Sequence, residues 1–281
     1  MDVVRPVDPK KRRVETLGLA LVAFVLVFIL WQTSSAGSLL YPFRLLVTFV
    51  HESGHGLAAI VTGGHFENFV VNDNGSGIAR TSGGNPLFIL PMGYLGAALF
   101  GGIILYAANR VKSAQSVAAI AGMYFLICGI LFTGEWAVLI GAGTAAVAWM
   151  LAGKIAHPGW LRLIALIALV ITLIIVRSNL ALFIGLSAGI VLLALASFRA
   201  SPAVRFGLDA LAFAVGLNAC DDLLYLWSNQ SAGVGTTPND ALAMAQYTNT
   251  PTWLWIVLWI GLALAIMGAA IYYGLLRERQ Q

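Results

Sequence analysis

The feature that most constrains this chain is a succession of apolar runs, each close to the length that crosses a lipid bilayer. About 20 helical residues, rising about 1.5 Å each, cross a hydrocarbon core about 30 Å thick. Lipid offers the backbone no hydrogen-bonding partners, so such runs must form helices. The sequence therefore predicts an all-α polytopic membrane protein of about nine transmembrane helices, with a range of about eight to ten. The predicted spans are 16–32, 40–62, 87–109, 114–133, 135–153, 159–176, 179–197, 204–228 and 252–276.

Composition supports an integral, multi-pass membrane protein. Hydrophobic residues make up 59% of the chain and charged residues 10%, whereas about 25% of a soluble domain is charged. The net charge of +4 does not indicate a nucleic-acid partner, because the basic residues form short clusters beside apolar runs, where membrane topology and lipid headgroups explain them. Cys128 and Cys220 both lie inside apolar runs, which supports neither a disulfide framework nor a cysteine-rich zinc module.

The expected organisation is a single membrane domain with short flanks. Residues 1–15 form a basic segment predicted to be cytoplasmic, 16–276 the integral-membrane domain, and 277–281 a tail. Two loops, 63–86 and 228–252, are long and polar. Within the first, β-favouring residues flank the pair Asn74 and Gly75, which predicts a short β-hairpin after the second span.

The basic residues give conflicting indications of orientation. The cluster Lys10–Arg13 places the start of the chain in the cytoplasm by the positive-inside rule. Strict alternation through nine spans then places several other basic residues outside. Either one span is miscounted or the rule fails here. The residues in conflict are Arg110, Lys112, Lys154, Arg199 and Arg277.

The second span contains the sequence HESGH at residues 51–55. Two histidines four residues apart project from one face of a helix, about 6 Å apart along its axis, which suits two positions around a tetrahedral zinc ion. Glu52 is placed to take a proton from water at the metal, as in the His-Glu-x-x-His pattern of metallopeptidases. Ionisable groups are costly at bilayer depth, so we predict a metal site with His51 and His55 as ligands and Glu52 as catalytic base.

A catalytic zinc ion usually has a third protein ligand. The candidates on the eighth span are Asp209, Asp221 and Asp222. If the second and eighth helices run parallel, Asp222 matches the depth of His55, whereas Asp209 lies some 20 Å away along the axis. Asp222 also shares a helix face with Asn218, which could fix its carboxylate. Asp222 is therefore the preferred ligand, against Asp221, Asp209 and the alternative that both neighbouring acids form an ordinary polar helix end.

These features resemble the site-2 protease family of intramembrane zinc metallopeptidases, and more nearly its bacterial B-like branch. The resemblance implies zinc bound by His51, His55 and Asp222, Glu52 as general base, and a bacterial cytoplasmic membrane as the location. It also implies that the 63–86 hairpin offers an edge to an extended substrate strand. The chain lacks the Leu-Asp-Gly of well-studied members. The similar blocks are VHESGH, TGG, SGIARTSGG, GYLGAALFG, GLNACDDL and NDALAMAQYTNTPTWLW.

The predicted function is hydrolysis of peptide bonds in or near the bilayer, in membrane proteins or membrane-helix peptides. The missing Leu-Asp-Gly motivates a zinc-binding pseudoprotease as an alternative, and charges within the membrane motivate a transporter with an ion pathway. His65 and His157 are predicted to be loop residues. The sequence assigns no oligomeric state, no particular substrate and no cleavage site.

Overall fold

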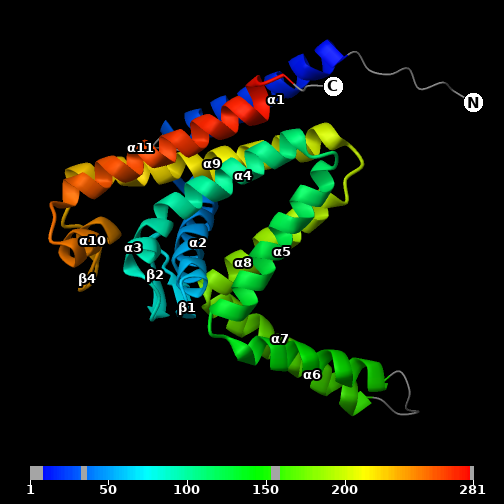
Figure 1. Cartoon of the computed structure of the whole chain (residues 1–281). Helices are drawn as coiled ribbons and strands as arrows, with labels where there is room; N and C mark the ends of the chain where they lie inside the picture. Colours follow the sequence, from blue (N-terminus) through cyan, green and yellow to red (C-terminus); the bar gives the residue numbers. More distant parts are fainter. Residues whose placement is uncertain (1–8, 33–36, 153–158, 279–281) are drawn as a thin grey trace, which may run out of the picture.

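The computed structural model of the chain describes residues 9–32, 37–152 and 159–278. Helices dominate the structure (Figure 1). The long helices are α1 (Pro9–Gln32), α2 (Gly37–Val61), α4 (Tyr94–Arg110), α5 (Ala114–Phe132), α6 (Trp136–Ala152), α7 (Gly159–Ser178), α8 (Leu180–Ala196), α9 (Ser201–Ser228) and α11 (Thr252–Ile271). The shorter elements are α3 (Pro86–Ile89), the 3₁₀-helix η2 (Leu90–Met92), α10 (Asp240–Thr248), the π-helix η3 (Tyr272–Leu276), and the strands β1 (His65–Val71), β2 (Gly77–Ser82), β3 (Gly233–Val234) and β4 (Thr237–Pro238).

The count of nine transmembrane helices is not confirmed, although a helix occupies each predicted run. Four helices are long and apolar enough to cross a bilayer: α5, the part of α7 from Trp160, α9, and α11 together with η3. A fifth is obtained if α3–η2 and α4, which are bent by 60° at a break, form one span. Three shorter apolar helices lie in α1, α6 and α8. Within the described ranges α2 falls in neither group, because the polar residues of HESGH interrupt its apolar sequence.

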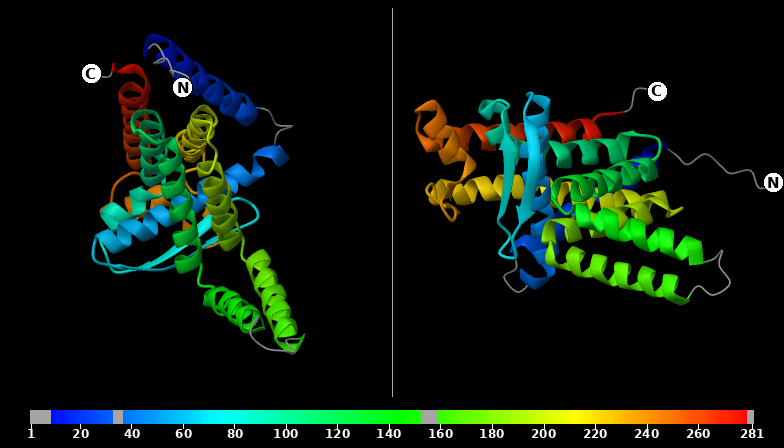
Figure 2. Two further views of the ribbon diagram at one scale, coloured as in Figure 1. Left: turned by 90° about the vertical axis from the view of Figure 1, so that its right-hand side faces the viewer. Right: turned by 90° about the horizontal axis from the view of Figure 1, so that it is seen from below.

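The direction of α2 differs from that of the other long helices around it. Helices α4, α9 and α11 pack side by side, and α1 packs on α9. Figures 1 and 2 show that α2 lies across the common direction of these helices rather than along it. Helices α5 and α8 form a second packed pair, and α6 and α7 form a hairpin that projects away from the rest (Figure 1). The helix that carries HESGH therefore packs against the α4–α9–α11 bundle with its axis across the axes of these three helices.

The predicted β-hairpin is confirmed. Strands β1 and β2 pair antiparallel, with Val71 opposite Gly77, and Asn74 and Gly75 lie in the turn between them. The Thr48 hydroxyl on α2 donates a hydrogen bond of 2.6 Å to the Gly75 carbonyl. This bond fixes the tip of the hairpin against the helix that carries HESGH. At the other end of the hairpin, Gly63 leaves α2 with a φ of +83°, a backbone conformation that favours glycine.

The polar loop 228–252 is more ordered than its composition predicts. It contains the β3–β4 pair and helix α10, neither of which the sequence analysis anticipated. Asn239 caps α10 by accepting a hydrogen bond of 2.9 Å from the Leu242 N–H, and its amide donates to the carbonyl of Ala232 at 2.6 Å. The buried face of α10, represented by Met244, belongs to a hydrophobic cluster that includes Trp259 of α11. This packing fixes the start of α10, and hence Asp240, against the bundle.

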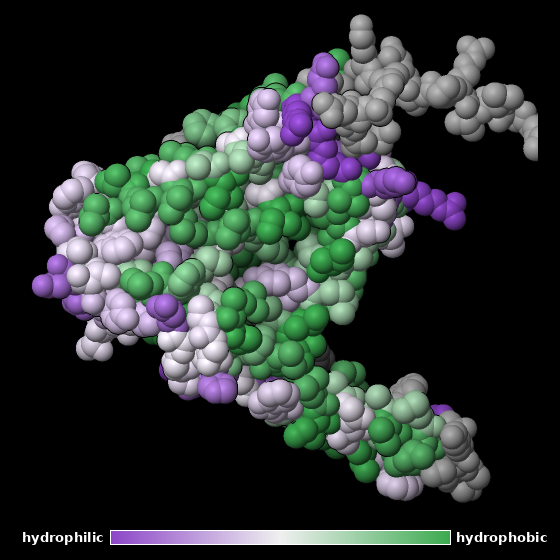
Figure 3. Space-filling model, viewed as in Figure 1, coloured by the Kyte–Doolittle hydropathy of each residue, from purple (hydrophilic) through white to green (hydrophobic). Residues whose placement is uncertain are grey.

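Large aliphatic side chains are exposed along the sides of the helices. Ile120, Ile140 and Ile103 have relative exposures of 71%, 70% and 62%. Figure 3 shows hydrophobic surface over much of the face seen in Figure 1, between two more polar ends. Apolar exposure of this extent is unfavourable in water and suits a lipid-facing surface. The apolar helices and their exposed faces identify an integral membrane protein.

Candidate metal centre

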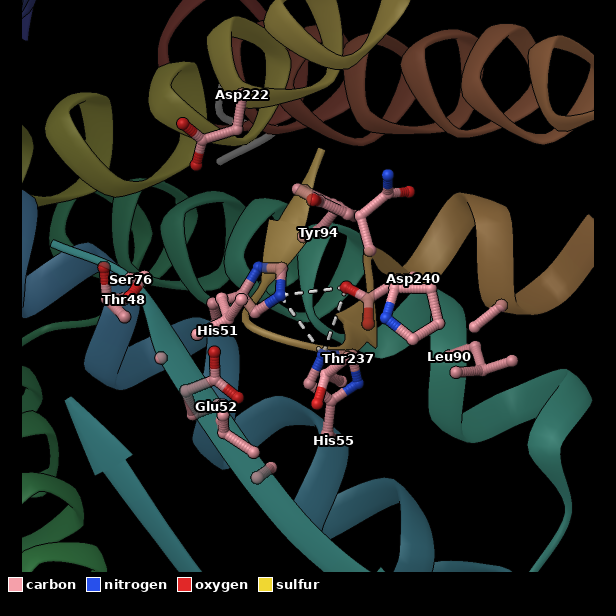
Figure 4. A pocket seen from close by; sticks show the side chains of 18 of the residues that line it. Thr48, His51, Glu52, His55, Ser76, Leu90, Tyr94, Asp222, Thr237 and Asp240 are labelled. Carbon is pink, nitrogen blue, oxygen red and sulfur yellow. Dashed lines mark hydrogen bonds and ion pairs between the residues drawn. The ribbon is translucent and has the colours of Figure 1, made fainter. Parts of the chain in front are cut away.

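The two histidines of HESGH lie one helical turn apart on α2 and direct their Nε2 atoms to the same point (Figure 4). Their Nε2 atoms are 3.1 Å apart. The Nδ1 atom of His55 lies 2.7 Å from the Ile89 carbonyl. A carbonyl can only accept, so Nδ1 carries the proton and donates it. In the neutral ring, Nε2 then has a free lone pair, which is the state that a metal ligand needs.

The carboxylate that completes this cluster is Asp240, at the first residue of α10. Its Oδ2 lies 3.1 Å from Nε2 of His51 and 3.3 Å from Nε2 of His55 (Figure 4). Around a tetrahedral ion with bonds of about 2.0–2.1 Å, two donors stand about 3.3 Å apart. The three donor atoms therefore form a triangle of the size that a zinc-like ion requires. His51, His55 and Asp240 form a group that could hold a metal ion.

The charge state of Asp240 suits this role. Burial alone would raise the pKa of its carboxyl group, but the positive charge of protonated His55 and the hydrogen bonds to both imidazoles outweigh burial. When His55 gives up this proton to bind a metal ion, the ion supplies the positive charge in its place. The net effect holds the pKa of Asp240 well below its ordinary value. The group is therefore an anion at neutral pH, and metal ligands must be deprotonated.

The structure does not bring the predicted third ligand, Asp222, into this triangle. Asp222 lies on α9, on the wall of the same pocket, and Figure 4 shows it above His51, apart from the dashed contacts among His51, His55 and Asp240. Asn218 donates a hydrogen bond of 2.5 Å to its carboxylate, as the sequence analysis expected. The comparison of depths that favoured Asp222 assumed that α2 and α9 run parallel. Because α2 lies across α9, the number of residues from the end of each helix does not give a common depth for His55 and Asp222.

The other two candidates are also outside the triangle. Asp221 has an exposed side chain on α9. Asp209 is buried nearer the start of the same helix, where it accepts a hydrogen bond of 2.7 Å from the Asn109 amide. Asp240 was not predicted as a ligand, although the block that it opens with Asn239 resembles the family. An Asn-Asp pair before a helix-favouring stretch is a helix-start signal, and it could have placed Asp240 at a fixed helix end.

Glu52, the predicted base, lies in the same pocket as the three donors but outside their triangle (Figure 4). Its side chain is 6% exposed. The backbone of Ala79 on β2 makes a hydrogen bond to the carboxylate, and a Cβ atom at Gly77 would stand only 2.5 Å from Glu52 Oε1. Strand β2 thus fixes the position of the Glu52 carboxylate beside the imidazoles.

The pocket that contains these groups has a volume of about 540 Å³. Strand β2 forms one wall, through Gly77, Ile78 and Ala79, and the β3–β4 turn with the start of α10 forms another. Tyr94, at the start of α4, packs edge-on against the His51 ring with centroids 4.5 Å apart. The donor atoms are therefore reached through a cleft between two strand pairs.

Two imidazoles, a carboxylate anion and a neighbouring glutamate, carried by an integral membrane protein, define a site of the metallopeptidase class. The sequence matches the profile of the Peptidase M50B-like family over residues 19–168 and 137–270. The chain belongs to this family, and the resemblance to site-2 proteases inferred from the HESGH block is confirmed. No curated protein and no solved structure matches the chain.

We expect Gly93→Ala to weaken metal binding by about 10-fold or more, the range found for groups next to metal ligands. A Cβ atom at Gly93 would stand 2.3 Å from Nε2 of His51 and 2.5 Å from Nε2 of His55. The φ of Gly93 is −63°, which alanine adopts readily, so lack of space is the cause. Metal content after dialysis against a competing chelator measures the effect.

Gly96→Ala, one turn further along, is the matched control. A Cβ atom at Gly96 would lie 3.4 Å from its nearest neighbour, the Cα atom of Gly54, so this variant should bind metal as the wild type does. Equal metal content in the two variants would show that the imidazoles do not occupy the described position.

Proposed function

We propose that this protein is a zinc metallopeptidase that hydrolyses peptide bonds of membrane proteins in or beside the bilayer, in a bacterial cytoplasmic membrane. The observation that carries the proposal is the triangle of donor atoms from His51, His55 and Asp240, with Glu52 in the same pocket. Membership of the Peptidase M50B-like family supports the same reaction class.

His51, His55 and Asp240 would hold the zinc ion, because two imidazole nitrogens and one carboxylate oxygen are a donor set that zinc accepts. A bound zinc ion supplies Lewis acidity, which makes water easier to deprotonate and a carbonyl carbon easier to attack. Asp222 interacts electrostatically with His51. We assign Asp222 the role of orienting His51 rather than of binding the ion.

Glu52 is the proposed general base. Its carboxylate accepts a proton from the attacking water, and the resulting carboxylic acid can return the proton to the leaving amine. The hydrogen bond from β2 and the close packing at Gly77 hold Glu52 in place, which limits the reorganisation that proton transfer would otherwise need.

The proposed substrate is a membrane helix that unwinds locally. Unwinding frees backbone groups that lipid cannot satisfy, so the extended segment needs new hydrogen-bonding partners. Strand β2 lines the pocket beside Glu52, and addition of a strand to an exposed sheet edge is a common way to bind an extended peptide. We propose that the substrate segment lies between β2 and the β3–β4 turn.

Removal of the metal tests this function. Full-length protein in lipid vesicles, supplied with a single-helix reporter, should lose cleavage on treatment with a zinc chelator and regain it with about one equivalent of Zn²⁺. Cleavage that persists after complete metal removal would contradict the proposal. Stoichiometric zinc without cleavage of any helix reporter would identify a pseudoprotease instead.

A further inference from the structure

Basic residues gather at the end of the bundle that is remote from the metal centre. The Arg110 guanidinium, at the end of α4, donates a hydrogen bond to the Arg277 carbonyl just after η3. The Gln115 amide on α5 donates to the Phe198 carbonyl at 3.2 Å, which joins the start of α5 to the end of α8. Figure 1 shows α1 beginning at this same end. Basic residues in the described parts of these helix ends are Arg110, Lys112, Arg199, Arg205 and Arg277, and the first turns of α1 contain Lys10, Lys11, Arg12 and Arg13.

The projecting α6–α7 hairpin also carries a basic residue on the side of the molecule where α1 begins. Arg162, on the first turn of α7, has an exposed side chain. Figures 1 and 2 place the start of α7 on the same side of the molecule as the start of α1. The base of the hairpin, where Glu135 accepts a hydrogen bond from Asn179, lies toward the opposite side.

The metal centre belongs to that opposite side. It is built at the start of α4, the last third of α9 and the start of α10, through Tyr94, Asp222 and Asp240. Figure 1 shows α10 and both strand pairs away from the starts of α1 and α9. The described basic residues outside the remote end, Arg44, Arg80 and Arg177, are separated along the chain, in α2, β2 and α7.

The direction of α2 removes the conflict between orientation and charge. If α2 lies across the bundle and does not span the bilayer, eight crossings are left: α1, the bent α3–η2–α4 unit, α5, α6, α7, α8, α9 and α11. An even number of crossings returns the end of η3 to the side where α1 begins. Four described residues that nine alternating spans would place outside then lie on the side of the N-terminal cluster, in agreement with the positive-inside rule: Arg110, Lys112, Arg199 and Arg277.

We propose that the basic end faces the cytoplasm and lies against the anionic headgroups of the inner leaflet, and that the metal centre opens to the other side of the membrane. The cytoplasmic leaflet is enriched in anionic lipids, and their negative charge attracts basic segments next to membrane helices. If the protein has the proposed function, this orientation places the cut in each substrate helix near the end that is farther from the cytoplasm.

Two matched serine-to-cysteine variants test the orientation. Ser231, between α9 and β3, and Ser197, at the end of α8, both have exposed side chains and carry no charge. In a full-length background with Cys128→Ala and Cys220→Ala, a membrane-impermeant maleimide should label Ser231→Cys in intact bacterial spheroplasts. Ser197→Cys should be labelled only in inside-out vesicles. Labelling of Ser197→Cys in intact spheroplasts would overturn the orientation.

A reporter helix with a different epitope tag on each flank tests the cleavage side. The fragment that keeps the cytoplasmic flank should contain most of the reporter helix, and a cut close to the cytoplasmic flank would overturn this part. Cysteine labelling needs no catalysis. A correctly oriented protein that cleaves nothing would therefore count against the proposed function alone, whereas metal-dependent cleavage with inverted labelling would count against the orientation alone.

Discussion

Glu52→Gln is expected to lower kcat/KM for a helix reporter by about 10²- to 10⁴-fold, the contribution typical of a general acid–base residue. Metal content should not change, because Glu52 lies outside the donor triangle of His51, His55 and Asp240. Glutamine keeps the shape of the side chain and the contact with β2 but cannot accept the proton. The reporter assay and zinc content of the same purified samples measure both parts.

Glu67→Gln is the matched control for this substitution. Glu67 lies on β1 of the same hairpin with an exposed side chain, so its replacement should leave cleavage and zinc content near wild-type values. Full cleavage by Glu52→Gln would remove Glu52 from the mechanism. Loss of zinc from Glu52→Gln would instead make Glu52 a ligand.

Asp240→Asn is expected to weaken zinc binding by more than about 100-fold, beyond the range of about 10- to 100-fold found for residues that only support a ligand. The substitution removes the negative charge that lies 3.1 Å and 3.3 Å from the two imidazole nitrogens. Asp222→Asn should reduce affinity by less, because Asp222 is outside the triangle. Competition with a chelator of known affinity gives both constants.

Asp221→Asn is the control for a change of charge on α9, since Asp221 has an exposed side chain next to Asp222. It should bind zinc as tightly as the wild type. The opposite ranking, with zinc lost from Asp222→Asn and kept by Asp240→Asn, would restore Asp222 as the third ligand and contradict the geometry described above.

Local sequence signals predicted much of this structure because they act over short distances. Apolar runs of bilayer length gave the positions of the long helices, and the pair Asn74 and Gly75 gave the hairpin. The four-residue spacing of His51 and His55 predicted that the two imidazoles share one helix face, and their Nε2 atoms are 3.1 Å apart. Each of these features depends on backbone geometry within one or two turns.

The direction of α2 could not be predicted in the same way. The length and polarity of a run indicate a helix but not its angle to neighbouring helices, which packing decides. The choice of Asp222 depended on a HESGH helix that runs parallel to α9, whereas α2 lies across α9.

Asp240 was missed for a related reason. It lies 189 residues from His51 in the chain, inside a loop whose polar composition gives no sign of burial. The cap at Asn239 signals a helix start, but only tertiary packing, through residues such as Met244 and Trp259, brings that start to the histidines. Contacts of such long sequence separation are not encoded in local patterns.

X-ray absorption at the zinc edge tests the central claim, that His51, His55 and Asp240 bind one ion, most directly. The measurement compares Asp240→Cys with Asp222→Cys, each in full-length protein that also carries Cys128→Ala and Cys220→Ala and is loaded with one equivalent of zinc. A zinc–sulfur distance of about 2.3 Å is expected in Asp240→Cys, and only nitrogen and oxygen at about 2.0–2.2 Å in Asp222→Cys. A sulfur neighbour in Asp222→Cys, with none in Asp240→Cys, would contradict the account.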